Sequence, residues 1–181
     1  MHFSLTLGGK NDSINLISWT DSDWAQDPDS WCSISSYVFD IAGSSVSWAS
    51  KKQPTVALST VEAKYMAALN ATKKAIWLHV LLENLGFTQV KATMIHGDNK
   101  GCIALLHGTV SHTCAKHIDI WHHFIRERIK NSEIDLIYCS TKDMIADMFT
   151  KQLLCKAFEK FCKALGVGEY GEVSSSGSYE R

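Results

Sequence analysis

The chain has 181 residues, of which 45% are hydrophobic and 20% are charged, and this is enough to bury the core of a single globular domain. No run approaches the roughly 18 consecutive apolar residues of a membrane helix, and the N-terminus lacks the basic and apolar segments of a targeting signal, so we expect no membrane attachment. The formal net charge of −1 argues against a generally basic nucleic-acid binder, so any phosphate contact must come from local clusters of Lys and Arg.

The six cysteines bear on the compartment. They form no CxxC pair and no framework spacing, which favours reduced thiols over a disulfide scaffold. We therefore expect an intracellular protein, cytoplasmic or nuclear, and we take it to be a monomer.

The N-terminal third predicts a meander of three strands. Residues 14–20 are an apolar, β-branched and aromatic run of strand length, and the polar segment that follows has turn chemistry. Residues 36–41 and 44–50 alternate apolar with polar on either side of a tight turn, which is the pattern of two antiparallel strands.

A long helix and two further strands follow. Ser59 and Glu62 form a capping box that begins a helix, which we expect to end near Leu85. The later segments predict, in order, a strand (VKATMIHG), two helices (DNKGCIALLH and KHIDIWHHFIRERIKN), a strand (EIDLIYCS) and a last helical region (KDMIADMFTK and CKAFEKFCKAL). This order predicts an α/β fold with a mixed five-stranded sheet, three antiparallel strands and then two parallel ones, and with helices on both faces.

Composition divides the chain into three parts. We expect a lead-in over residues 1–13, one domain over 14–167, and a tail over 168–181. The tail is rich in Gly, Ser and Glu and has too little apolar surface to pack, so we expect it to be disordered.

Four acidic side chains stand where a predicted strand ends or in a predicted helical segment: Asp21, Glu62, Asp98 and Asp147. Singly, each has an ordinary explanation, namely a turn, a capping box, a helix N-cap and a solvated helix face. Ligands of α/β sheets gather at the carboxyl ends of the strands, so together the four predict a shared site. Because Mg²⁺ prefers hard oxygen ligands, such a cluster would suit a metal-dependent phosphodiester hydrolase.

Five segments carry a resemblance to a known family: TDSDWAQD, SWASKKQPTVALSTVEAKY, GDNKGCIAL, KHIDIWHHFIRE and STKDMIADMFTK. In order and spacing they resemble the ribonuclease H domain of the Pol polyprotein of copia-type LTR retrotransposons, from about Ile14 to Val167. The resemblance implies a ribonuclease H-like fold and endonucleolytic cleavage of the RNA strand of RNA–DNA hybrids. It also implies that the four carboxylates are catalytic residues that bind two Mg²⁺ ions, for which Mn²⁺ could substitute. Besides the hybrid, the implied partner is a reverse transcriptase domain, which this chain lacks.

Six residues are candidates for contact with nucleic acid: Lys51, Lys52, Gln53, Asn99, Lys116 and His117. The first three precede the long helix and could meet phosphate or sugar, although a solvated turn would carry the same residues. Asn99 could instead share the N-cap of the short helix, and His117 could be a structural or capping histidine. We expect the tryptophans to pack in the core or on the sheet face rather than to stack on bases.

The sequence departs from the family pattern at several positions. Lys64 replaces an acid, Trp31-Cys32-Ser33-Ile34 replaces a basic run rich in Ser and Thr, and Cys114-Ala115 and Gln152 also differ from the usual residues. These losses fall on binding and packing, so a second interpretation stays open, namely a catalytically silent remnant that folds and at most binds nucleic acid. A third interpretation is a zinc site, whose ligands would be His112, Cys114, His117 and His122.

Overall fold

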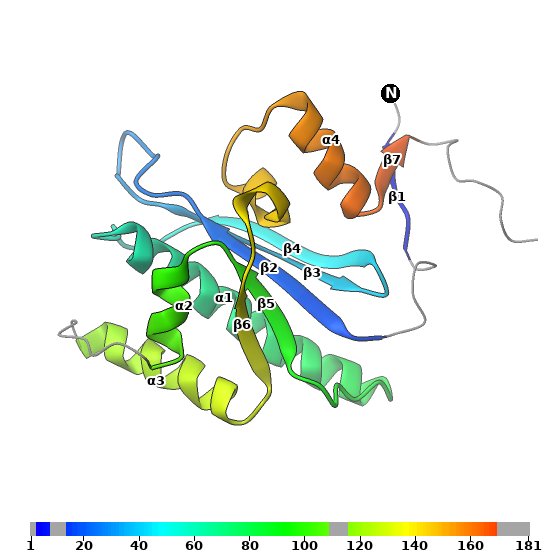
Figure 1. Ribbon diagram of the computed structural model, residues 1–181, viewed down its shortest axis with the longest axis horizontal. Coiled ribbons are helices and arrows are strands. Elements are labelled where there is room, and N and C mark those ends of the chain that lie inside the picture. The colour runs from blue at the N-terminus through cyan, green and yellow to red at the C-terminus, as the bar shows by residue number, and fades with distance from the viewer. Residues whose placement is uncertain (1–2, 8–13, 109–115, 170–181) are drawn as a thin grey trace, which may run out of the picture.

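The computed structural model describes residues 3–7, 14–108 and 116–169, and at its centre lies a mixed five-stranded sheet (Figure 1). The strands are β2 Leu16–Ser22, β3 Ile34–Ile41, β4 Ser44–Lys52, β5 Thr93–Gly97 and β6 Ile134–Tyr138. They lie in the order β4-β3-β2-β5-β6. β2, β3 and β4 are antiparallel, whereas β5 pairs in parallel with both β2 and β6. The predicted sheet, three antiparallel strands followed by two parallel ones, is confirmed.

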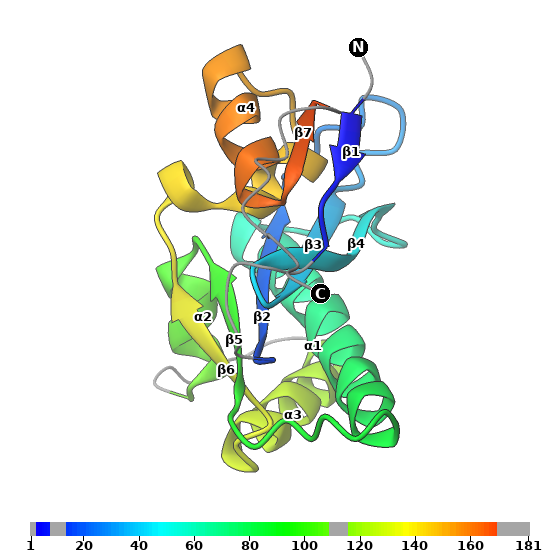
Figure 2. The same cartoon turned by 90° about the vertical axis from the view of Figure 1, so that its right-hand side faces the viewer.

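Helices cover both faces of this sheet (Figures 1 and 2). They are α1 Thr60–Asn84, α2 Lys100–Leu106, α3 Lys116–Lys130 and α4 Cys155–Ala164, together with two short 3-10 helices, η1 Thr141–Asp143 and η2 Ile145–Phe149. α1, α2 and α3 lie on one face, and η2 and α4 lie on the other. The prediction of helices on both faces is therefore confirmed.

Alternation along β3 supplies both hydrophobic cores. Successive residues of a strand point to opposite faces of the sheet. Phe39 packs with Leu69 of α1 and Ile95 of β5, whereas Val38 packs on the opposite side with Phe161 of α4. Val38 and Phe39 are both 0% exposed, so the sheet is buried on both sides at this point. Burial on both faces is typical of a sheet covered by helices.

A second, two-stranded sheet lies outside the pattern that the sequence predicts. β1 (Phe3–Leu5) pairs antiparallel with β7 (Val167–Glu169), and the N–H of Thr6 donates a hydrogen bond to the carbonyl of Gly166 at 2.9 Å. Strands of three residues are too short to give a periodic signal. Part of the expected lead-in and the first two residues of the expected tail belong to this sheet, and the rest of the tail lies outside the described residues.

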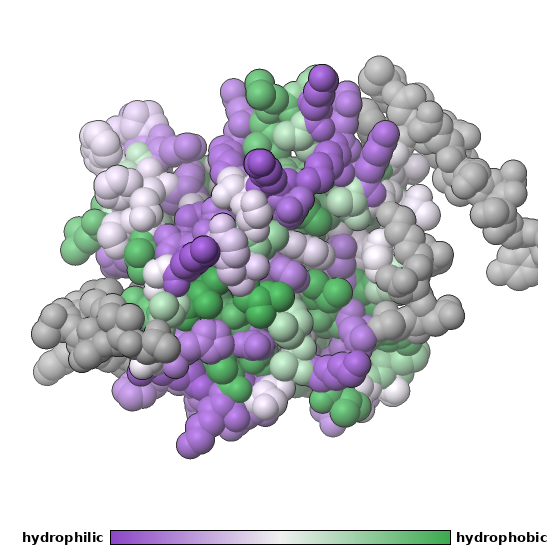
Figure 3. Space-filling model, viewed as in Figure 1, coloured by the Kyte–Doolittle hydropathy of each residue, from purple (hydrophilic) through white to green (hydrophobic). Residues whose placement is uncertain are grey.

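The surface around α4 mixes polar and apolar side chains. In the view of Figure 3, hydrophilic residues lie beside hydrophobic ones over α4, and further hydrophobic ones cross the middle of the same face below it. Lys156, Lys160 and Lys163 are exposed on α4. Within the described ranges, no helix has the combination of length and apolar character that crossing a bilayer needs.

Candidate active site

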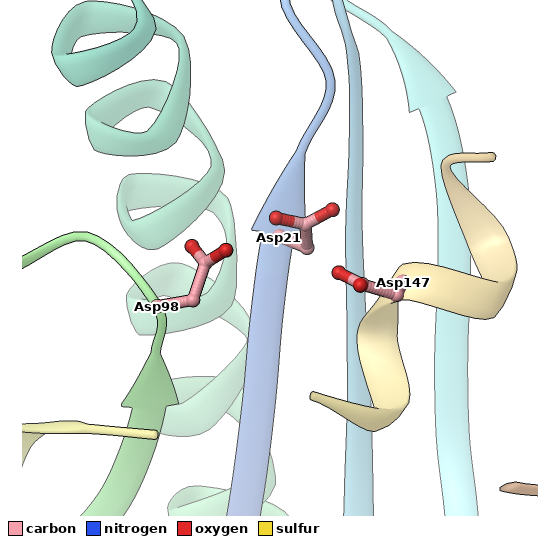
Figure 4. Close-up of side chains that lie close together, drawn as sticks. All are labelled: Asp21, Asp98 and Asp147. Carbon is pink, nitrogen blue, oxygen red and sulfur yellow. The ribbon is translucent and has the colours of Figure 1, made fainter. Parts of the chain in front are cut away.

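Three carboxylates meet at one edge of the sheet (Figure 4). Asp21 is near the end of β2, Asp98 directly follows β5, and Asp147 lies in η2, and one oxygen of each lies within 4.8 Å of the others. β2 and β5 are parallel neighbours, with Trp19 opposite His96, so their carboxyl ends reach the same edge. The structure thus brings together three of the four acids that the sequence predicts to converge.

Hydrogen bonds to the sheet hold Asp147 at this edge. Ser36 Oγ donates to the carbonyl of Ala146 at 2.9 Å, and Ser50 Oγ donates to the carbonyl of Phe149 at 2.7 Å, which fastens η2 to β3 and β4. Asp147 is only 2% exposed. Asp147 therefore does not lie on a solvated helix face, so the ordinary explanation for an acid at this position does not hold.

Asp21 is buried and both of its oxygens accept hydrogen bonds. Lys64 Nζ donates to Oδ1 at 2.6 Å, and Thr150 Oγ1 donates to Oδ2 at 2.7 Å. Burial is the largest influence on the pKa of Asp21 and raises it, but the charge and hydrogen bond of Lys64, with the Thr150 hydrogen bond, outweigh burial and hold the pKa below its ordinary value. Asp21 therefore carries its negative charge at neutral pH.

Lys64 joins Asp21 to Asp98. Its Nζ also donates to Asp98 Oδ1 at 2.5 Å, and the Lys64 side chain is 19% exposed. Burial lowers the pKa of Lys64, but the two carboxylates more than offset this and raise the pKa above its ordinary value. Asp98 is held more loosely on its other oxygen, which accepts from Thr141 Oγ1 at 3.5 Å.

Asp147 is the least satisfied of the three acids. Its Oδ2 accepts from Lys151 Nζ at 2.7 Å, but its Oδ1 is buried and finds no hydrogen-bond partner among the described residues. Burial, with a smaller contribution from the charge of Asp21, raises the pKa of Asp147 to about 6. A buried carboxylate oxygen without a donor is the kind of atom that a bound cation would satisfy.

The structure corrects the assignment of Glu62 to this cluster. The Glu62 carboxylate accepts from the N–H of Leu58 at 2.8 Å, and its own N–H donates to Ser59 Oγ at 3.1 Å, so it serves the start of α1. Each residue turns the helix by about 100°, so Glu62 and Lys64 point about 200° apart around its axis. The position on α1 that faces Asp21 and Asp98 is therefore 64, where this chain has a lysine.

The structure also corrects the prediction that Gln53 contacts nucleic acid, because Gln53 is an interior residue. It is 3% exposed, and its Nε2 lies within hydrogen-bond distance of Ser22 Oγ at 3.2 Å, Ser35 Oγ at 2.7 Å and the carbonyl of Ala63 at 2.9 Å. These contacts link β2, β3 and α1. Gln53 therefore cannot reach nucleic acid from this position.

The other candidate contacts have mixed outcomes. Lys52 is exposed and forms an ion pair with Asp27 in the loop after β2. Asn99 is the N-cap of α2, and its side chain accepts from the N–H of Cys102 at 2.8 Å. Lys116 and His117 are the first residues of α3, and the structure describes their backbone only, so their contact with nucleic acid stays a prediction. The zinc hypothesis falls on the same stretch, since His112 and Cys114 lie outside the described residues.

A basic groove lies between α1 and the strands β3 and β4. Its volume is about 420 Å³, and its lining includes Lys51, Lys73, Lys74 and Trp77. Trp77 is 54% exposed, and Lys74 Nζ lies 3.8 Å from the centre of its ring. The expectation that the tryptophans pack in the core or on the sheet face is therefore wrong for Trp77, and it is also wrong for Trp24, which is 51% exposed in the loop after β2. Helical periodicity places Trp77 on α1 but does not show that its face of α1 leaves the core.

The three carboxylates are the type of ligand that a divalent metal ion prefers, but the positive charge of Lys64 beside them opposes metal binding. Two ligands of one Mg²⁺ ion are at most about 4.2 Å apart, since each Mg–O distance is about 2.0–2.1 Å, so the cluster at 4.8 Å would have to close slightly or share two ions. The obstacle is the Lys64 ammonium, which takes the facing oxygens of Asp21 and Asp98.

Solved structures share this fold. The structure is similar to LC11-RNase H1, which was isolated from compost by a metagenomic approach, with a TM-score of 0.57 and 14% identity, covering 81% of this chain and 97% of that one. It is also similar to LC11-RNase H1 in complex with an RNA/DNA hybrid, with a TM-score of 0.56, 12% identity and coverage of 79% and 99%. The protein thus has a ribonuclease H-like fold, as predicted.

Sequence comparison gives the relatives of the chain. It is 35% identical over 158 residues to the retrovirus-related Pol polyprotein from transposon RE1 of Arabidopsis thaliana, covering 87% of this chain and 11% of the polyprotein. It is 40% identical over 161 residues to that from transposon TNT 1-94 of Nicotiana tabacum, covering 89% of this chain and 12% of the polyprotein. No family model matches the chain. Its homologues are therefore retrovirus-related Pol polyproteins of transposons, which confirms the resemblance read from its motifs.

Proposed function

We propose that the chain is a ribonuclease H domain of the copia type, built for endonucleolytic cleavage of the RNA strand of RNA–DNA hybrids with divalent metal ions. The observation that carries this proposal is the convergence of Asp21, Asp98 and Asp147 at the strand edge of a ribonuclease H-like fold. Bound Mg²⁺ or Mn²⁺ ions would supply an activated water and neutralise charge on the scissile phosphate.

The chain's own residues orient the acids. Thr150 fixes one oxygen of Asp21, and the bonds from Ser36 and Ser50 hold the backbone on either side of Asp147. Asp21 lies near the end of β2 and Asp98 directly follows its parallel neighbour β5, so their separation follows from the sheet itself. A site positioned by strands and fastened turns is suited to chemistry that depends on placement of charge.

The basic groove is the surface that we assign to the hybrid. Lys51 and Lys73 offer cations for phosphates, and the exposed ring of Trp77 offers a face for a sugar or base. Such contacts read backbone and shape rather than base identity, which suits a nuclease without sequence preference.

An intracellular site of action accompanies this proposal. Five described cysteines are free thiols: Cys32, Cys102, Cys139, Cys155 and Cys162. Free thiols are typical of reducing compartments, cytoplasmic or nuclear. A reverse transcriptase domain is the partner that we propose beside the hybrid, because the relatives are polyproteins much longer than this chain.

The direct test is cleavage of a hybrid whose RNA strand is labelled. We expect slow cleavage of the RNA strand with 10 mM Mg²⁺ or Mn²⁺, none of duplex DNA, and loss of cleavage with EDTA or in Asp98→Asn. Cleavage that persists in Asp98→Asn would exclude this site as its source.

A second candidate function is favoured by one observation, the two ion pairs of Lys64. In this alternative the domain is catalytically silent and at most binds nucleic acid. Hybrid affinity that falls with rising salt, without any turnover in either metal, would support it over the first.

A further inference from the structure

We propose that the Lys64 ammonium occupies the cation position of the acidic cluster, so that a side chain of the protein itself takes the place of a metal ion between Asp21 and Asp98. The inference rests on the proposed function in one respect, namely that this cluster is the metal site of a ribonuclease H. It concerns what the site holds in this chain and how tightly a metal can bind there.

The first argument is geometric. Nζ of Lys64 lies 2.6 Å from Asp21 Oδ1 and 2.5 Å from Asp98 Oδ1, so it bridges the two strands in the way that a shared cation would. Both oxygens of Asp21 are then in use, one by Lys64 and one by Thr150. A metal ion could take Oδ1 of Asp21 only by displacing the lysine.

The second argument is space. The small cavity lined by Lys64 and Asp98, together with residues such as Thr20 and Cys102, measures about 10 Å³, and its lining does not include Asp21 or Asp147. That volume is near the least that one water molecule needs, so the Lys64 ammonium has little room to move away from the two carboxylates on this side.

The third argument is that Lys64 cannot easily withdraw. Its neighbours on α1, Ala63, Tyr65 and Met66, are 0%, 2% and 5% exposed, and the Ala63 carbonyl lies 2.9 Å from Gln53 Nε2. The backbone at position 64 is therefore fixed beside the two strands. Retraction of the ammonium would also leave two neighbouring carboxylates without their shared cation.

The second lysine of the site differs in this respect. Lys151 pairs with Asp147 from the loop after η2, and its side chain is 33% exposed, against 19% for Lys64. It can swing into solvent without moving a helix. Lys64 is therefore the residue that we hold responsible for excluding the metal.

The test measures metal binding without any substrate. Free Mn²⁺ is followed by electron paramagnetic resonance while the metal is titrated into wild-type protein, Lys64→Gln and Lys64→Glu. The control is Lys91→Gln, which removes the same charge at an exposed position. Asp98→Asn in the Lys64→Gln background assigns any new binding to this cluster.

We expect Lys64→Gln to bind Mn²⁺ on the order of 100-fold more tightly than wild type, because a unit charge a few ångströms from a dication is removed. Lys64→Glu should bind at least as tightly as Lys64→Gln, and Lys91→Gln should behave as wild type. The proposal would be overturned if wild type and Lys64→Gln bound Mn²⁺ with equal affinity and if adding Asp98→Asn to Lys64→Gln abolished that binding.

A measurement on the wild type keeps the test decisive if a variant does not fold. The ¹⁵Nζ resonance of the Lys64 ammonium should be protected from exchange with water and unmoved by Mg²⁺ below about 1 mM, since its two short charge-assisted hydrogen bonds hold it at the carboxylates. A Lys64 signal that shifts and saturates with Mg²⁺ below 1 mM would show that the metal displaces the lysine, and would refute the inference.

The two proposals fail in different ways. If Lys64→Glu binds Mn²⁺ tightly but cleaves no hybrid, the nuclease function fails while the role of Lys64 stands. If wild type cleaves the hybrid and Lys64→Gln neither binds metal more tightly nor cleaves faster, the role of Lys64 fails while the function stands.

Discussion

Gln53 joins the elements that carry the acidic cluster, and replacing it should loosen them measurably. Its side-chain amide lies within hydrogen-bond distance of Ser22 and Ala63, which are the chain neighbours of Asp21 and Lys64, and of Ser35 on β3. Gln53→Met keeps nearly the same volume, so the change removes polar partners without leaving a large cavity.

The expected loss can be worked from these contacts. The amide has two N–H groups, so at most two of the three contacts are hydrogen bonds at one time, and each contributes about 1 kcal/mol net. A buried partner left unpaired costs about a further 1 kcal/mol, but Met also removes Oε1 of Gln53, which is buried without a partner among the described residues, so we expect a loss of about 1–3 kcal/mol. For a domain of this size that is a fall in Tm of roughly 3–10 °C.

Urea unfolding followed by circular dichroism measures this loss. The matched control is Gln26→Met, at an exposed glutamine, which should change the free energy of unfolding by less than about 0.5 kcal/mol. If Gln53→Met is as stable as this control but binds hybrid more weakly, Gln53 is a surface contact and our interpretation of it is wrong.

Three further predictions follow from the packing, the groove and a half-buried histidine. Phe161→Ala should lower the free energy of unfolding by about 3–5 kcal/mol in urea, because Phe161 is 3% exposed in the core beneath α4, whereas a loss under about 1 kcal/mol would mean that α4 is not docked. The double variant Lys51→Ala, Lys73→Ala should reduce the slope of log affinity for hybrid against log salt by about 2, and an unchanged slope would remove the groove from the binding surface. Burial lowers the pKa of His79, so below a pH of about 6.5 the unfolded chain takes up a proton that the folded protein resists, and stability falls. His79→Gln should therefore lose less stability than wild type between pH 7.5 and 5, and equal losses in urea titrations at the two pH values would contradict this.

The sheet could be predicted from sequence because its strands are long enough to show a pattern. Residues 14–20 form an apolar, β-branched and aromatic run, the two segments flanking Ala42 and Gly43 carry period-two alternation and a turn, and the structure has β2, β3 and β4 there. β1 and β7 have three residues each, and their pairing depends on contact between the two ends of the described domain. No local signal could have indicated it.

The convergence of Asp21 and Asp98 could be predicted because both lie at the carboxyl ends of strands that share one edge. The role of Glu62 could not, since a capping box and a ligand at a helix start use the same residue, and only the orientation of α1 decides between them. The sequence does show that Lys64 replaces an acid. What it does not show is that Nζ of this lysine reaches both neighbouring acids.

The burial of Gln53 could not be predicted from its local sequence either. Its neighbours in the chain, Lys51 and Lys52, are exposed, and nothing local indicates that the next side chain turns inward. Its burial depends on hydroxyls of β2 and β3 and a carbonyl of α1 that meet only in the folded protein.

One side-by-side assay tests the central claim, that this is a ribonuclease H site whose cation position is held by Lys64. Wild type, Lys64→Glu and Lys64→Glu with Asp98→Asn are incubated with the labelled hybrid in Mg²⁺. We predict that Lys64→Glu cleaves the RNA strand at least about tenfold faster than wild type and that the double variant does not cleave it. A folded Lys64→Glu protein that binds Mn²⁺ at this cluster and still leaves the hybrid intact would contradict the account.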